Sequence, residues 1–134
     1  MVRSRDDMWF KAGIIQLILM KQPERALELL SKLYQIEVPK LTVGLVKGRS
    51  KAAAVYVLRR KTICASNRDS LFNPAVILHE FYHHLRTRSG KHRGTEKHAD
   101  LFAQEYLDAY AKAVAFRSVV DHRDNSLDDK MAIQ

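Results

Sequence analysis

The chain has 134 residues, of which 46% are hydrophobic, so it can build one core and is expected to form one domain over residues 1–134. Its single cysteine, Cys64, excludes an internal disulfide framework and predicts a cytoplasmic protein. The formal net charge of +8 is compatible with acidic peptides or nucleic acid as partners, although a solvated basic surface is the simplest explanation.

Two helices are predicted at the N-terminal end. Asp7 can cap the first, over residues 8–20, and Pro23 suits the first turn of the second. The apolar run of the first helix is interrupted by Lys11 and Gln16 and is too short to span a bilayer. No membrane partner is therefore expected.

Three short apolar or β-branched segments follow, over residues 41–46, 53–58 and 62–66. Residues 59–61 are strongly basic and form a predicted turn between the last two. These segments predict a small antiparallel three-stranded sheet. With helices on both sides of it in the sequence, the expected fold class is α+β.

The next predicted helix starts at Pro74 and ends around Gly90, and it contains the pattern HExxH at His79, Glu80 and His83. Four residues are slightly more than one helical turn, so the two imidazoles share one face and can bind one metal ion. Glu80 lies about 100° around the helix from His79, where its carboxylate can take a proton from a bound water. Two half-buried histidines without a metal are the plain alternative, but a shuffled chain would contain this pattern with a probability of only about 1 in 100.

A further helix is predicted from Thr95 to about Arg117, and it contributes Glu96 and Asp100 on one face. A catalytic zinc site normally has three protein ligands, and Glu96 can be the third. Asp100 can orient a zinc-bound imidazole by accepting its other N–H. Either acid alone would more simply be solvated helix surface, but their spacing after HExxH favours the metal site.

Other ligand sets remain open. His98 or His92 could replace Glu96 and give an all-histidine site like that of SprT-like proteases. Cys64 could complete a His/His/Cys set, although its sequence context favours a buried strand residue. His84 is expected to support the site from behind or to lie on the surface.

The two motifs together resemble those of the gluzincin metallopeptidases, in which HExxH is followed by a helix bearing ExxxD. Residues 96–103 are also similar to the ExxA(D/N)xFA signature of small gluzincin-like domains, including the minigluzincins and those grouped with the ImmA/IrrE regulators. The resemblance covers residues 53–107, and its specificity lies in the motifs.

The resemblance implies one zinc ion bound by His79, His83 and Glu96, with Glu80 as the general base and Asp100 as support. The implied function is zinc-dependent endopeptidase activity on a peptide or protein substrate. An edge strand beside the zinc could bind an extended peptide by main-chain pairing. A Tyr or His donor for the oxyanion is also expected. The candidates are Tyr106, His98, Tyr110, Tyr56 and His92.

The alternative is a basic regulatory or nucleic-acid-associated module with a structural or idle zinc site. Its basis is the group of basic residues around the predicted site: Arg59, Arg60, Lys61, Arg86, Arg88, Lys91, Arg93 and Lys97. The intact Glu80 favours the enzyme, because a structural zinc site does not need a general base.

The segment of residues 118–134 differs in charge from the rest of the chain. Four Asp against one Arg and one Lys give it a net charge of −2, beside +10 for the remainder. It is expected either to fold back over the basic cleft and make the enzyme latent, or to form a frayed or helical terminus. The sequence does not indicate an oligomeric state.

Overall fold

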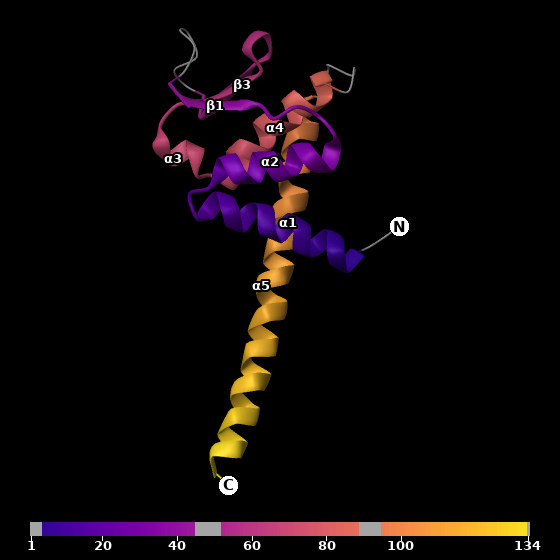
Figure 1. Cartoon of the computed structure of the whole chain (residues 1–134), viewed down its shortest axis with the longest axis vertical. Coiled ribbons are helices and arrows are strands. Elements are labelled where there is room, and N and C mark those ends of the chain that lie inside the picture. The colour runs from indigo at the N-terminus through magenta and orange to yellow at the C-terminus, as the bar shows by residue number, and fades with distance from the viewer. Residues whose placement is uncertain (1–3, 45–51, 89–94, 134) are drawn as a thin grey trace.

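The structure, a computed structural model, describes residues 4–44, 52–88 and 95–133. It confirms the expected α+β class. Figure 1 shows a small sheet at one end of the molecule, several helices beneath it, and one long helix, α5, that leaves this body and ends at the C-terminus. Within the described ranges, no helix has both the length and the apolar character needed to cross a membrane.

The two N-terminal helices are α1 (Ser4–Leu19) and α2 (Pro23–Tyr34), and they pack against each other. Pro23 stands in the first turn of α2, as predicted. Asp7 does not cap α1, because the helix already begins at Ser4. Instead, the Asp7 carboxylate pairs with the Lys11 ammonium one turn later, at 3.0 Å.

The sheet contains β1 (Lys40–Val43), β2 (Ala54–Val57) and β3 (Thr62–Ala65) in the order β1-β3-β2. β2 and β3 are antiparallel, but β1 pairs with β3 in parallel, so the prediction of a fully antiparallel sheet is wrong in this respect. The sequence between β1 and β2 is long enough that no tight hairpin turn forces these two strands to pair. The predicted strand residues 45–46 lie outside the described residues.

The turn between β2 and β3 is a short 3₁₀ helix, Leu58–Arg60, followed by Lys61 in the left-handed region at φ 50°. This confirms the turn predicted for the basic residues 59–61. Because the turn is tight, β2 and β3 form a hairpin, and β2 becomes an edge strand of the sheet.

The HExxH helix is α4 (Pro74–Arg88), and a one-turn helix that the sequence did not predict, α3 (Arg68–Leu71), precedes it. The Asn67 side chain caps α3 by accepting the Ser70 N–H at 2.9 Å. The predicted end of α4 near Gly90 falls outside the described residues.

The glutamate helix is α5 (Glu96–Ile133), and it is longer than the predicted span to Arg117. Thr95 caps it, as predicted, by accepting the His98 N–H at 3.1 Å. No proline or glycine occurs in the helix to stop it. Its C-terminal half leads away from α4 and the sheet (Figure 1), so residues 118–133 do not fold back over the site. The helical alternative for this segment is the one observed.

The core lies where α1, α2, α4 and α5 meet one another and the sheet. The central strand β3 is buried along its whole length. The large fully buried side chains include Ile14, Ile18, Leu27, Ile63, Ile77, Phe81 and Tyr106. This packing holds α4 and the first half of α5 in a fixed relation, which positions the candidate site.

Candidate metal centre

Helix α4 presents His79 and His83 on one face, one turn apart. Their ring centroids are 5.0 Å apart, and both side chains are about one-fifth exposed. The flanking residues Leu78 and Phe81 are fully buried, so the helix cannot rotate without losing core packing. The burial of these two hydrophobic residues therefore holds the two imidazoles at the protein surface.

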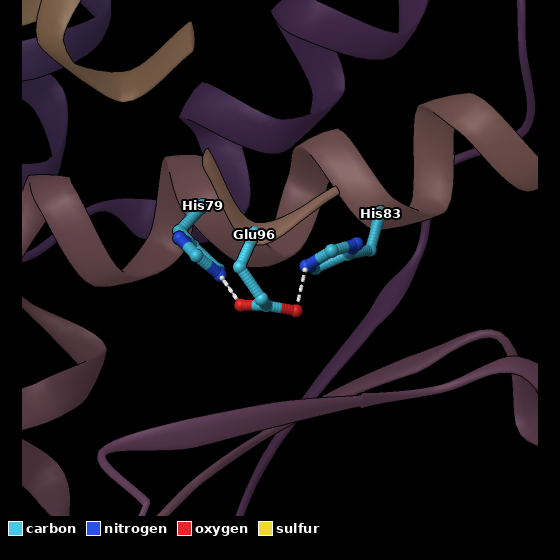
Figure 2. A group of neighbouring side chains, drawn as sticks. All are labelled: His79, His83 and Glu96. Atoms are coloured by element: carbon cyan, nitrogen blue, oxygen red, sulfur yellow. Dashed lines mark hydrogen bonds and ion pairs between the residues drawn. The ribbon is translucent and has the colours of Figure 1, made fainter. Parts of the chain in front are cut away.

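Glu96, the first residue of α5, reaches both imidazoles (Figure 2). One carboxylate oxygen lies 2.7 Å from His79 Nε2, and the other lies 3.1 Å from His83 Nε2. The candidate ligand atoms of these three residues all lie within 4.8 Å of one another. The structure thus brings together the three residues predicted as metal ligands, from two different helices.

Asp100 lies one turn after Glu96, and its carboxylate is 2.8 Å from His79 Nδ1. A carboxylate accepts, so His79 Nδ1 carries the proton. His79 then has a carboxylate at each ring nitrogen, since Glu96 faces Nε2. Such an imidazole is satisfied either by a second proton or by a cation at Nε2, which is the donor arrangement of a metal-binding histidine.

The two imidazoles have opposite pKa shifts. Burial alone would lower the pKa of His79, but its hydrogen bonds to Glu96 and Asp100 and the charge of Glu80 raise it above the ordinary value. Burial lowers the pKa of His83, and the charge of Glu96 does not fully offset this. His83 is therefore the more readily neutral imidazole, the form that binds metal.

Glu80 is buried beside this cluster, with one carboxylate oxygen 4.0 Å from His79 Nε2. Burial raises its pKa to about 7, with a smaller upward contribution from Glu96. The charge of His79 and a hydrogen bond from the Tyr56 backbone oppose this shift. A carboxyl group with a pKa near neutrality can both accept and release a proton.

A cleft of about 540 Å³ runs between β2 and α4. Ala54, Tyr56 and Leu58 contribute to the strand side. The helix side includes Glu80 and His83, and Glu96 reaches in from α5. Two of the candidate ligands, His83 and Glu96, and the buried Glu80 carboxyl group therefore line one open cleft.

The backbone of β2 faces this cleft. The Ser66 N–H donates to the Ala53 carbonyl at 2.8 Å, which fixes the alternation of the β2–β3 ladder. The backbone groups of Val55 therefore face β3, and those of Ala54 and Tyr56 point toward the cleft. The outer edge of β2 thus runs along the cleft, where the Tyr56 backbone hydrogen-bonds to the Glu80 carboxyl group.

Tyr106, predicted as an oxyanion donor, does not reach the cleft. It is fully buried, and its hydroxyl lies 3.0 Å from the hydroxyl of Tyr34 in the core. Ten residues along a helix separate it from Glu96 by about 15 Å and by about 280° of rotation. The prediction for Tyr106 is therefore wrong.

The other predicted donors are placed as follows. His98 is exposed, and its ring contacts the Thr95 hydroxyl rather than the ligands. Tyr110 packs against the core. Tyr56 lines the cleft, but its hydroxyl lies 2.7 Å from His84 Nδ1. His92 lies outside the described residues.

The rival ligands His98 and Cys64 are not part of the cluster that the described residues form. Cys64 is buried in the central strand, where its sulfur accepts a hydrogen bond from the Thr42 hydroxyl at 3.6 Å. This matches the expectation of a small buried strand residue.

His84 was expected either to support the site from behind or to lie on the surface, and the surface alternative is wrong. This side chain is fully buried, and both of its ring nitrogens are hydrogen-bonded. A usable signal was present, because His84 is four residues after Glu80 and so shares its helical face. The helical position of His84 is easily overlooked, because the adjacent His83 already accounts for the HExxH motif.

The basic residues near the cleft are only partly described. Arg59 and Arg60 are exposed on the turn after β2, and Lys61 pairs with Glu37 at 3.0 Å. The Arg86 guanidinium lies over the Tyr82 ring, 5.9 Å from its centroid. Lys91 and Arg93 lie outside the described residues.

Comparison with known proteins finds no matching family model, no matching curated protein and no matching solved structure.

Proposed function

We propose that this protein is a zinc-dependent endopeptidase of the small gluzincin type. In this proposal His79, His83 and Glu96 bind one zinc ion, and Glu80 is the general base. The observation that carries it is the convergence of the three ligand atoms within 4.8 Å, with the Glu80 carboxyl group beside them.

The donor set fits zinc. Two imidazole nitrogens and one carboxylate are the ligands of one common type of catalytic zinc site, which leaves a further position for water. The hydrogen bond between Asp100 and His79 Nδ1 supports this, because it leaves Nε2 to face the metal position.

The chemistry divides between the metal and Glu80. Bound at this site, zinc would lower the pKa of a water molecule to about 7 and polarise the scissile carbonyl. Glu80 would take a proton from the water and pass it to the leaving amine. The raised pKa of Glu80, about 7, suits the second step, and a cation beside His79 would favour the carboxylate needed for the first.

The substrate in this proposal is an extended peptide that pairs with β2. The backbone groups of Ala54 point into the cleft and can accept and donate main-chain hydrogen bonds, whereas the Tyr56 backbone already hydrogen-bonds to the Glu80 carboxyl group. A peptide bound in this way would pass Glu80 and His83 on the opposite wall. We also propose a cytoplasmic location, because Cys64 is the only cysteine and is buried.

The test compares wild-type protein with Glu80→Gln, after zinc loading and dialysis, on a library of internally quenched peptides. We expect near-stoichiometric zinc in both proteins and a loss of cleavage rate of about 100- to 10,000-fold in the variant. Glu24→Gln, which changes an exposed glutamate of α2, is the matched control and should retain full activity.

Two results would contradict the proposal. Cleavage by Glu80→Gln at the wild-type rate would remove Glu80 as the base. A wild type that holds zinc but cleaves no peptide would favour the alternative, a basic binding module with an idle zinc site. Exposed Arg59 and Arg60 beside the cleft favour that alternative, and salt-dependent binding of DNA would support it.

A further outcome concerns the third ligand. Zinc retained without Glu96 would favour a SprT-like all-histidine site.

A further inference from the structure

His84 is a fully buried polar side chain of α4, and it lies behind the residues that line the cleft. Its Nε2 lies 2.8 Å from the Glu37 carbonyl oxygen, in the connection between α2 and β1. Its Nδ1 lies 2.7 Å from the Tyr56 hydroxyl on β2. One imidazole therefore joins α4 to two other parts of the fold.

The direction of these hydrogen bonds follows from their partners. A carbonyl oxygen can only accept, so His84 Nε2 must donate to Glu37. In the neutral ring, Nδ1 then accepts from the Tyr56 hydroxyl. Both nitrogens are satisfied, as a buried imidazole requires, since each unmade hydrogen bond would carry a desolvation cost.

Tyr56 is attached to α4 at two points. Its hydroxyl binds His84, and its backbone hydrogen-bonds to the Glu80 carboxyl group. Glu80 and His84 are four residues apart and so lie one above the other on α4. Tyr56 therefore spans one helical turn, with its main chain at one end and its hydroxyl at the other.

We propose that Tyr56 and His84 are positioning residues that hold the edge strand β2 and the Glu80 carboxyl group in register. The proposal rests on the proposed function, because it assigns Glu80 as the base that needs this alignment. If the hydroxyl link were lost, β2 could shift along or away from α4. The Tyr56 backbone would then no longer hold the Glu80 carboxyl group where it can reach the water.

The test is Tyr56→Phe, which removes only the hydroxyl. Its matched control is Tyr34→Phe, which also removes one tyrosine hydroxyl and its hydrogen bond, here the 3.0 Å bond to the Tyr106 hydroxyl away from the cleft. We expect Tyr56→Phe to lower kcat by about 10- to 100-fold with a smaller change in KM, as small misplacements of reacting groups do. Zinc content should match the wild type, and Tyr34→Phe should keep kcat within about two-fold of wild type.

A second measurement does not depend on catalysis. Hydrogen–deuterium exchange at the β2 amides should be faster in Tyr56→Phe than in wild type, and unchanged in Tyr34→Phe. If the wild type cleaves no peptide, the proposed function fails, but this measurement still tests the link between the strand and α4. Equal exchange and equal kcat in the two variants would overturn the inference.

His84→Gln keeps the test decisive if Tyr56→Phe cannot be purified. The glutamine amide can still donate to the Glu37 carbonyl, but it cannot reproduce the imidazole geometry toward Tyr56. Lower kcat, with faster exchange at β2, would support the positioning role. Wild-type values for both would overturn it.

Discussion

The two halves of α5 differ in what they contact. Up to Ala113 the helix buries a seam of small residues, Ala99, Ala103, Ala109 and Ala113, together with Tyr106. The small side chains let α5 lie close to α1 and α4. From residue 114 to 120 every side chain is exposed, although the Phe116 ring still lies 5.8 Å from the Trp9 ring of α1, and beyond this stretch the helix leaves the body of the molecule (Figure 1).

This difference separates the part of α5 that builds the site from the part that does not. Glu96 and Asp100 occupy the first two turns of the packed half, where the core fixes their position. Among the described residues, the exposed half contributes no ligand to the cluster. We therefore expect changes in the two halves to have unequal effects.

The largest expected contrast is between Glu96→Ala and Arg117→Ala. Loss of Glu96 removes a proposed metal ligand, so zinc measured by elemental mass spectrometry after dialysis should fall sharply. Peptidase activity should fall by more than the 10- to 100-fold typical of losing an outer partner of a metal ligand. Arg117→Ala should change neither quantity, and unchanged zinc in Glu96→Ala would refute the ligand assignment.

A second contrast concerns stability. Tyr106→Ala should lower the free energy of unfolding by about 3–5 kcal/mol, because it removes a fully buried aromatic ring and leaves a cavity. Val119→Ala, at a side chain that is 54% exposed, should change it by less than about 0.5 kcal/mol. Urea denaturation followed by circular dichroism measures both. Similar losses in the two variants would mean that the second half also packs.

Asp100→Asn should have an intermediate effect. The amide can place its N–H rather than an oxygen toward His79 Nδ1, so the tautomer of His79 is no longer fixed. We expect zinc affinity to fall by about 10- to 100-fold, measured by competition with a chelator. Asp108→Asn, farther along α5 and exposed, is the matched control and should bind zinc like the wild type.

The smallest effect is expected from truncation after Arg117. Because residues 118–133 lead away from the cleft, their removal should leave zinc content and peptidase activity unchanged. A rise in activity would show that the segment covers the cleft in solution and would revive the latent enzyme expected as one alternative from the sequence.

The local parts of the cluster of His79, His83 and Glu96 could be predicted because they depend on short-range geometry. Helical periodicity places His79 above His83 wherever the helix forms, and Thr95 marks the start of the helix that begins with Glu96. The same period places Asp100 on the helical face of Glu96. The meeting of these two acids with His79 depends on the packing of α5 against α4, and it was expected only from the usual three ligands of a catalytic zinc site and from the resemblance.

The features that were predicted wrongly depend on long-range packing. β1 pairs with β3 in parallel because β3 lies in the centre of the sheet, between β1 and β2. The residue pattern of a strand does not specify the position of that strand in the sheet. Tyr106 looked suitable because it lies on the glutamate helix, but its partner Tyr34 comes from α2. The link between Tyr56 and His84 was not predicted at all, and it joins residues 28 positions apart.

The three ligands come from two helices, α4 and α5, and this has a thermodynamic consequence. An ion bound by His79, His83 and Glu96 would crosslink α4 to α5, so occupancy would add directly to the stability of the fold. At a free zinc concentration 100 times Kd, the gain would be about 2.7 kcal/mol. A thermal melt in the presence of graded zinc would then serve as a binding titration, without any substrate.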